Sequence, residues 1–213
     1  MIQQKTGNEH FTFDEMPQGF LLQDFWRWQS SDLLNNTLRG ILAEFLVAKA
    51  LGMDTSEPRV EWDSYDLLFN DRVRIEVKSS AYIQSWAQKA DSVLRFSIRP
   101  TRAWCAEHGY SDELLRQSDM YIFCVFAERD RTQADPMTLD KWEFYPVLTS
   151  ELNDLAKAQQ TAALSTLVRL CPEPYDFSIL RDAVTWLLSD RTDAEARHRI
   201  DAHNALRRKT KTE

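Results

Sequence analysis

Two short apolar runs separated by a turn carry charged side chains where a β-sheet would bury them. The first run, residues 65–69, has Asp66 near its start. The second run, residues 73–77, contains Glu76 and is followed directly by Lys78. Charged groups are rarely placed inside apolar strands unless another group compensates them. The pattern therefore predicts a hairpin that carries a charged site.

The alternation of side chains determines how the two runs pair. Successive side chains of a strand point to opposite faces, so Glu76 and Lys78 share one face. A three-residue loop at 70–72, with Asn-Asp as a turn signal, places the apolar side chains of both runs together. A two-residue loop would mix apolar and charged faces, which a half-buried hairpin disfavours. The predicted cross-strand pairs are Phe69 with Val73, Leu67 with Ile75, and Asp66 with Glu76.

Two neighbouring carboxylates repel each other unless a proton or a cation lies between them. Oxygen ligands without His or Cys nearby suit Mg²⁺, with Mn²⁺ as an alternative. Beside such a metal, Lys78 can orient or help to deprotonate an attacking water, or stabilise charge that builds up on a phosphate. The combination is suited to metal-assisted hydrolysis of a phosphodiester.

A helix predicted over residues 32–51 supplies a further candidate. Its expected apolar stripe consists of Leu38, Ile41, Phe45 and Ala48. At roughly 100° per residue, Glu44 lies about 60° from Ile41 and about 40° from Ala48, within the margin of that stripe. An inward-leaning carboxylate needs a partner, and the metal site could be that partner. The alternative is an ordinary carboxylate at the helix edge, paired with a surface Lys or Arg.

In these residues the chain resembles the PD-(D/E)xK nuclease superfamily, which includes restriction endonucleases and Holliday-junction resolvases. The residues that carry the resemblance are Glu44, Asp66, Glu76-Val77-Lys78 and Gln84. The resemblance covers roughly residues 38 to 130. The chain departs from the named motif at one position, because Tyr65, not proline, precedes the aspartate. The resemblance implies an α/β fold with a restriction-endonuclease-like core, in which helices flank a central mixed β-sheet.

The resemblance also implies a role for each residue of the site. Lys78 would be the catalytic lysine, and Gln84 would contact the scissile phosphate or the attacking water. A capping or loop-bonding role for Gln84 remains open. The implied ligands of Mg²⁺, or of Mn²⁺, are Asp66, Glu76, the backbone carbonyl of Val77 and, as an auxiliary ligand, Glu44.

Two alternatives concern the same residues. Asp63 competes with Asp66 for the role of first ligand, but it has the opposite parity in the chain, and Asp66 is preferred. Glu76 and Lys78 could instead form a solvated strand face with an ion network across the strands. The placement of the charges in compatible register favours the metal site.

A basic segment surrounds these residues in an otherwise acidic chain. Residues 72–102 carry seven Lys or Arg against two acidic side chains, a net charge of +5, whereas the whole chain has −7. A phosphate backbone requires such a local excess. Trp86 could stack on a base, although a position at the core edge is preferred. The predicted nucleic-acid contacts are Lys89, Arg95, Arg99 and Arg102.

The length of 213 residues predicts one nuclease-like domain over 1–190, followed by a basic helical tail over 191–213. Residues 195–213 have a net charge of +3, and the tail is expected to be solvated, with DNA or partner contact as the alternative. The other expected elements are a helix over 101–117, strands over 93–98, 120–126, 141–148 and 164–170, and a helix over 150–160.

Several function classes are excluded by what the sequence lacks. It has no apolar run near the ~20 residues of a membrane span and no apolar stretch typical of a secretory signal. Its three cysteines are widely spaced and form no metal-ligand pattern, so they are interpreted as reduced thiols of a cytoplasmic protein.

The resulting prediction is a metal-dependent nuclease that hydrolyses DNA phosphodiester bonds. An endonuclease is the preferred form, with a role in repair, restriction or phage defence. DNA is the expected partner, no membrane is involved, and a homodimer or a partner protein is left open. The alternatives are a catalytically inactive DNA-binding or assembly module of the same fold, and an RNA-directed nuclease.

Overall fold

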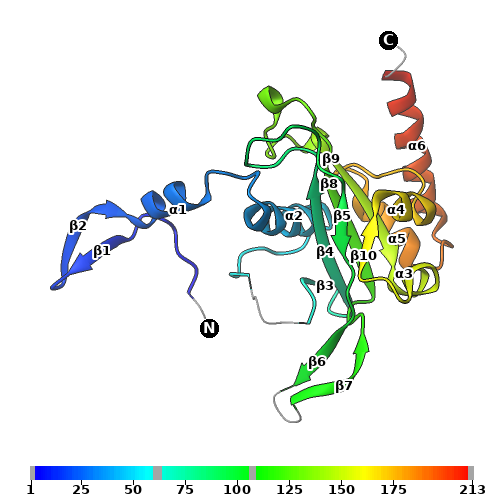
Figure 1. Ribbon diagram of the computed structural model, residues 1–213, viewed down its shortest axis with the longest axis horizontal. Helices are drawn as coiled ribbons and strands as arrows, with labels where there is room; N and C mark the ends of the chain where they lie inside the picture. The colour runs from blue at the N-terminus through cyan, green and yellow to red at the C-terminus, as the bar shows by residue number, and fades with distance from the viewer. Residues whose placement is uncertain (1–2, 60–63, 106–108, 211–213) are drawn as a thin grey trace.

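The computed structural model describes residues 3–59, 64–105 and 109–210 of the chain. Its centre is a four-stranded mixed sheet with the order β3-β4-β8-β9 (Figure 1). The outer pairs β3–β4 and β8–β9 are antiparallel, and the central pair β4–β8 is parallel. The strands are β3 (Leu67–Phe69), β4 (Val73–Ala81), β8 (Met120–Phe126) and β9 (Trp142–Leu148).

The hairpin of β3 and β4 has the predicted register. Phe69 pairs with Val73 and Leu67 pairs with Ile75, on either side of the three-residue loop. Asn70 and Asp71 adopt the left-handed conformation, with φ of 52° and 56°, which Asn and Asp tolerate better than most residues. The loop and the parity argument are therefore confirmed.

Helices α2 (Asn36–Ala50) and α5 (Leu180–Leu188) cover one face of the sheet. The carboxamide of Asn35 caps α2 by accepting hydrogen bonds from the backbone N–H groups of the first turn. The buried side of α2 includes Ala43, Leu46 and Val47, which join the apolar side chains of the sheet in one core.

The predicted apolar stripe of α2 is wrong at Ile41 and Phe45, whereas Ala48 is buried as predicted. Ile41 is 37% exposed and Phe45 is 47% exposed, whereas Ala43 and Val47 are fully buried. Two apolar spacings compete in this helix, and both are compatible with a period of 3.6 residues. Packing against the sheet selects the spacing of Ala43 and Val47, so Ile41 and Phe45 turn toward the outside.

The opposite face of the sheet is covered by a second layer, which surrounds the buried side chains of Phe123, Val125 and Tyr145. The layer consists of the antiparallel pair β5 (Arg95–Ser97) and β10 (Thr161–Ala163) with helices α3 (Thr149–Ala156) and α4 (Leu164–Leu170). The strand expected over 164–170 is therefore wrong. Leu164, Leu167 and Cys171 have the spacing of one helical face, and Leu167 is fully buried against this core.

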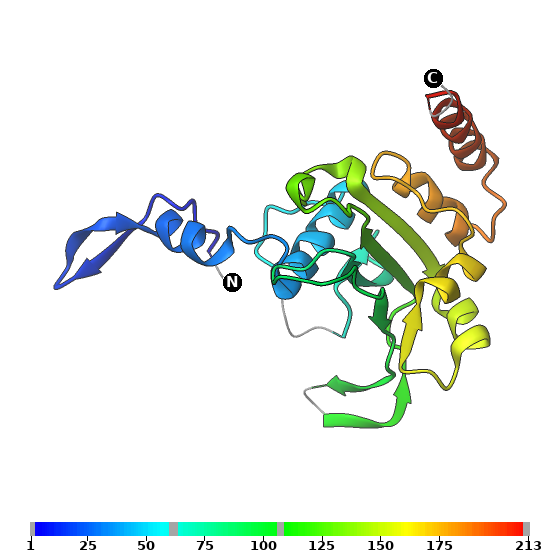
Figure 2. The same ribbon diagram turned by 45° about the horizontal axis from the view of Figure 1, so that its top comes forward.

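The helix expected over 101–117 is also wrong, because this segment forms the hairpin of β6 (Thr101–Cys105) and β7 (Gly109–Leu115). Gly109 has φ of 70°, a conformation that favours glycine and disfavours a continuous helix. The hairpin extends beyond the sheet on one side of the molecule (Figures 1 and 2).

The C-terminal helix α6 (Ala194–Thr210) packs on α5. Its side chains Ala196 and Ile200 are buried, with Ile179 and Ala183 on the other side of the contact. The mixed α/β fold with a central mixed sheet, flanking helices and a C-terminal helical extension is thus confirmed. The first turns of the extension are anchored by this apolar contact, contrary to the expectation of a solvated tail.

An N-terminal arm precedes α2. It consists of the hairpin β1 (His10–Phe13) and β2 (Met16–Leu21) and the helix α1 (Leu22–Ser30). Both views show the arm extending away from the sheet and its helices (Figures 1 and 2). No residue of these three elements is buried.

The remaining expectations concern thiols and membrane spans. Cys124 and Cys171 are free thiols in the interior, and burial raises the pKa of both. Within the described residues, no helix combines the length and the apolar character that a membrane crossing requires.

Candidate active site

An open pocket of about 460 Å³ lies where β3 leaves the edge of β4. Because pairing with β3 begins only at Leu67, the stretch of β4 from Val77 to Ser79 has no β3 partner, and it lines the pocket. Helix α2 forms the opposite wall. The residues of the pocket that carry chemistry are Glu44, Arg59, Asp66 and Lys78.

Asp66 stands at the point where the two strands separate. Its backbone N–H donates to the carbonyl of Ile75 at 3.0 Å. Its carboxylate oxygen Oδ2 accepts a hydrogen bond of 2.7 Å from the backbone N–H of Val77. The other oxygen, Oδ1, accepts no hydrogen bond from a described residue, so one oxygen of this carboxylate is available to a ligand in the pocket.

Glu76 and Lys78 lie on the same face of β4, as the parity argument predicted, and they form an ion pair with each other. Glu76 also accepts a hydrogen bond of 3.3 Å from the hydroxyl of Ser118. Lys78 lines the pocket, whereas Glu76 does not. The ion pair corresponds to the alternative interpretation of these residues.

Glu44 lies on the pocket side of α2, and both of its carboxylate oxygens accept hydrogen bonds from Arg59. Its side chain is only 12% exposed. Burial raises the pKa of Glu44, and the negative charge of Asp66 adds to this effect, while Arg59 and Lys78 oppose it. The predicted alternative, a carboxylate paired with an arginine, is present, but the pair lies inside the pocket.

The donor set fits a hard divalent cation in its chemistry. Glu44 and Asp66 supply carboxylate oxygens, and none of the described His or Cys residues lines the pocket. Oxygen ligands of this kind are those that Mg²⁺ and Mn²⁺ prefer. Over residues 3–59, 64–105 and 109–210, however, no three His, Cys, Asp or Glu side chains converge on one point. Glu76 could become a third ligand only by giving up Lys78. Asp63, the competing candidate, lies outside the described residues.

The raised pKa of Glu44 leads to a test of cation binding. A carboxylate with a raised pKa takes up its proton at a higher pH than an ordinary glutamate, and a protonated Glu44 cannot bind a cation. We expect the affinity for Mn²⁺ to fall as the pH decreases from neutral through this pKa. Calorimetric titration at a series of pH values measures the effect.

The Glu44→Gln variant is the control for this titration, because it cannot lose a proton at this position. Its affinity for Mn²⁺ should be lower at neutral pH and should change less over the same pH range. An identical pH dependence in both proteins would contradict a role of Glu44 in binding the cation.

Gln84 lies in the interior rather than in the pocket. Its Oε1 accepts a hydrogen bond of 3.1 Å from Arg39, and its Nε2 donates to the carbonyl of Ala81 at 2.9 Å. Burial lowers the pKa of Arg39 to about 10. Gln84 could contact a phosphate only by leaving these partners, so the structure favours the loop-bonding role that the sequence left open.

The loop after β4 presents an aromatic side chain. Trp86 is 53% exposed, which agrees with the half-buried position that the sequence favoured. Arg131 holds the loop by donating to the backbone carbonyls of Gln84 and Trp86 at 2.9 and 2.7 Å. The side chains of the four predicted nucleic-acid contacts, Lys89, Arg95, Arg99 and Arg102, are exposed.

Sequence reasoning missed two arginines, Arg59 at the pocket and Arg131 at this loop. Both belong to segments without a regular apolar period, so no local pattern singles them out. Their partners are distant in the sequence: Arg59 binds a glutamate 15 positions earlier, and Arg131 binds a carbonyl 47 positions earlier.

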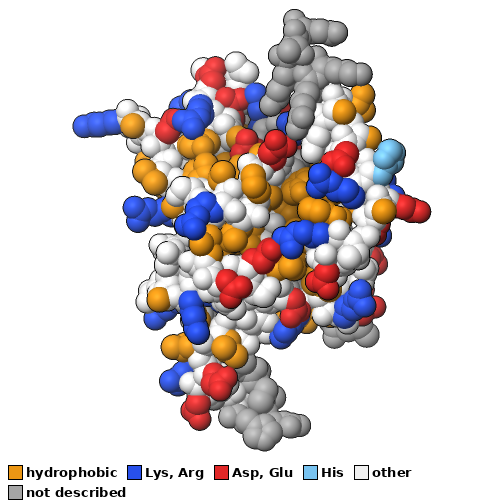
Figure 3. Space-filling view, turned by 90° about the vertical axis from the view of Figure 1, so that its right-hand side faces the viewer, with side chains coloured by type: hydrophobic (Ala, Val, Ile, Leu, Met, Phe, Trp, Pro, Cys, Tyr) orange, Lys and Arg blue, Asp and Glu red, His pale blue; other side chains and the backbone are white. Residues whose placement is uncertain are grey.

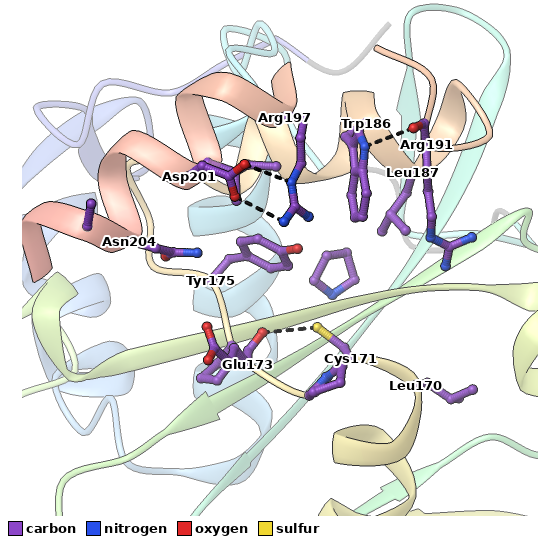
Figure 4. A pocket seen from close by; sticks show the side chains of 15 residues that line it. Leu170, Cys171, Glu173, Tyr175, Trp186, Leu187, Arg191, Arg197, Asp201 and Asn204 are labelled. Atoms are coloured by element: carbon purple, nitrogen blue, oxygen red, sulfur yellow. Dashed lines mark hydrogen bonds and ion pairs between the residues drawn. The ribbon is translucent and has the colours of Figure 1, made fainter. Parts of the chain in front are cut away.

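A larger pocket of about 570 Å³ lies on another face, between α5, α6 and the segment before α5. Figure 3 shows this face, with apolar side chains gathered in a hollow. In Figure 4, Tyr175 and Trp186 point into the pocket, and Arg197 pairs with Asp201. Among the described residues, no lysine lines this pocket. The combination of two carboxylates with a lysine belongs to the pocket at β4.

The family model of bacteriophage T4 endonuclease IV matches residues 22–165, more than half of the chain. The chain belongs to this family. The match includes α2, the whole central sheet and every described residue that lines the pocket at β4. Comparison with curated proteins and with solved structures gives no match.

Membership of the endonuclease family confirms the predicted class of enzyme, a nuclease and hence a hydrolase. Its matched range contains all the predicted site residues, including Gln84 and the basic segment up to Arg102. The hairpin β1–β2 and the helices α5 and α6 lie outside that range.

Proposed function

We propose that the protein is a Mg²⁺-dependent DNA endonuclease of the PD-(D/E)xK type. The observation that carries the proposal is the pocket at the open edge of β4, which Glu44, Asp66 and Lys78 line together. Membership of the endonuclease family supports the reaction class. The oxygen-only donor set supports the metal, for which Mn²⁺ is an alternative.

Each residue of the pocket has a distinct task in this proposal. Asp66, through its available Oδ1, and Glu44 would hold the metal, and Glu76 and the Val77 carbonyl would complete the set once Lys78 turns to the substrate. When bound, the metal would polarise the scissile phosphate and lower the pKa of a water molecule.

Lys78 acts on the water and on the phosphate. Its ammonium group holds the attacking water in line with the scissile P–O bond and stabilises negative charge that develops on the phosphate. The water oxygen bonds to phosphorus as the bond to the 3′ oxygen breaks. The water loses a proton to solvent and the 3′ oxygen takes one up, so the products carry a 3′ hydroxyl and a 5′ phosphate. Arg59 neutralises Glu44 in the absence of a cation, so it competes with the metal for this carboxylate.

A locally basic segment of the chain supports a nucleic-acid substrate. Residues 72–102 have a net charge of +5, and the side chains of Lys89, Arg95, Arg99 and Arg102 are exposed for contact with a phosphate backbone. The exposed Trp86 offers an aromatic face for stacking on an unpaired base. Backbone contacts of this kind carry no base specificity.

The test is a cleavage assay with the purified chain. Plasmid, linear duplex, single-stranded and branched DNA and single-stranded RNA are incubated with Mg²⁺, with Mn²⁺ or with EDTA. We expect cleavage of at least one DNA substrate with either metal and none with EDTA. Cleavage that persists in EDTA would overturn the metal dependence. DNA binding without cleavage in any condition would indicate an inactive binding module, and a preference for RNA would indicate an RNA-directed nuclease.

A further inference from the structure

The N-terminal arm is an ordered unit that displays aromatic side chains to solvent. Phe11 and Phe20 stack across its hairpin with ring centroids 4.9 Å apart. The start of α1 is bonded back to the chain before the hairpin, because Gln23 N–H donates to the carbonyl of Gly7 at 2.9 Å. The ring of Trp26 lies against Gly7 so closely that a Cβ there would approach it to 2.9 Å. The arm therefore has a defined structure of its own.

The apolar surface of this arm is large. The exposed fraction reaches 71% for Phe13 and 84% for Trp28. The large apolar side chains exposed on the arm are Phe11, Phe13, Met16, Phe20, Phe25, Trp26 and Trp28. With ~150–250 Å² for each whole aromatic side chain, their exposed parts amount to roughly 800 Å² per arm. A monomeric protein rarely leaves so much apolar surface in water, and about 800 Å² is what one partner contributes to a stable interface.

The charge of the arm disfavours nucleic acid as its partner. Residues 3–30 carry two basic and four acidic side chains, a net charge of −2. Asp14 and Glu15 occupy the turn of the hairpin, at the tip of the arm. A phosphate backbone would be repelled there, so the aromatic surface fits a protein.

The body of the chain has an exposed apolar surface next to the candidate active site. Ile41, Phe45 and Leu68 are 37, 47 and 37% exposed, and they line one pocket of about 560 Å³ between α2 and β3. Glu44 and Asp66 line this pocket as well. The hairpin and α1 of the same chain point away from it, as both ribbon views show (Figures 1 and 2).

We propose that the arm binds a second copy of this chain. The aromatic side chains of each arm would pack on the partner's apolar surface at Ile41, Phe45 and Leu68, which we call the seat. A two-fold arrangement uses both arms and both apolar surfaces, so that neither surface is left without a partner. A different protein on the arm would leave the seat uncovered. The exchange places the arm of one protomer beside the catalytic pocket of the other and brings two pockets into one particle.

The experiment is a measurement of mass in solution by sedimentation equilibrium, without DNA or metal. The wild type is expected at twice the chain mass of 24.9 kDa. The arm variant Phe25→Ser/Trp28→Ser and the seat variant Phe45→Ser should each weaken dimerisation by about 100-fold or more, because apolar anchors dominate such interfaces. The control Leu206→Ser removes an apolar side chain of similar exposure, 64%, from α6 and should leave the dimer unchanged.

Circular dichroism should show that each variant keeps its fold, because the substituted side chains are exposed. A wild type that stays monomeric up to its solubility limit would overturn the proposal. The proposal would also be overturned if the arm variant formed a dimer as stable as that of the wild type. If the arm variant weakened the dimer but Phe45→Ser did not, the arm would bind a surface other than the seat. None of these outcomes depends on cleavage, so the dimer and the enzymatic activity are tested separately.

Discussion

Replacing Lys78 with alanine should lower kcat for DNA cleavage by about 10²–10³-fold, the usual loss when one group that stabilises transition-state charge is removed. The ammonium group of Lys78 lines the pocket together with Glu44 and Asp66, and in the proposed reaction it acts on the water and on the phosphate. KM should change much less, because the exposed basic residues outside the pocket supply most of the substrate binding.

The fold should survive this substitution. Lys78 is 29% exposed, and its partner Glu76 keeps the hydrogen bond from Ser118. The loss of a partly exposed ion pair costs less than about 1 kcal/mol in the free energy of unfolding. Lys157→Ala, which removes an exposed lysine after α3, is the matched control and should cleave like the wild type. A folded Lys78→Ala protein with wild-type kcat would refute the proposed mechanism.

Asp66→Asn should abolish cation binding and reduce cleavage by about 10³-fold or more while leaving stability nearly unchanged. The asparagine carbonyl can still accept the hydrogen bond from Val77 N–H, but it lacks the negative charge that a hard cation requires. Asp66→Ala removes the acceptor as well. The orphaned N–H of Val77 should then lower the free energy of unfolding by about 1–3 kcal/mol.

Comparison of the two variants separates the structural role of Asp66 from its chemical role. Calorimetry with Mn²⁺ measures cation binding, urea denaturation measures stability, and the plasmid assay measures cleavage. Wild-type affinity for Mn²⁺ in Asp66→Asn would show that the cation binds elsewhere. Equal stability of the Asn and Ala variants would show that the bond to Val77 does not support the strand edge.

Elements whose structure depends on residues close together in the chain could be predicted from the sequence. The hairpin register of Leu67 with Ile75 follows from side-chain parity and from one turn, both contained in a short stretch of chain. The buried strand Met120–Phe126 follows from an unbroken apolar run, and it lies inside the sheet as expected. The nuclease class followed from charges placed in these same strands.

Predictions were less successful where the apolar residues of a segment fit both a strand and a helix, or two different faces of one helix. The segment 164–170 has apolar residues that suit both a strand and one face of a helix, and only its contact with the second layer favours the helix. In α2 the choice between the faces of Ile41 and Ala43 depended on where the sheet lies. In 101–117 the turn at Gly109 outweighed the helical pattern.

The sequence by itself determined which residues could form the site, because Asp66, Glu76 and Lys78 are placed by alternation along two adjacent strands. Only the tertiary structure decided how their charges are balanced. Glu76 pairs with Lys78, whereas Glu44 lines the pocket together with Asp66 and accepts hydrogen bonds from Arg59. The physical reason is the distance along the chain over which each effect acts. Alternation of side chains is set by neighbouring residues, whereas a buried carboxylate pairs with a cationic side chain that folding brings within hydrogen-bond distance.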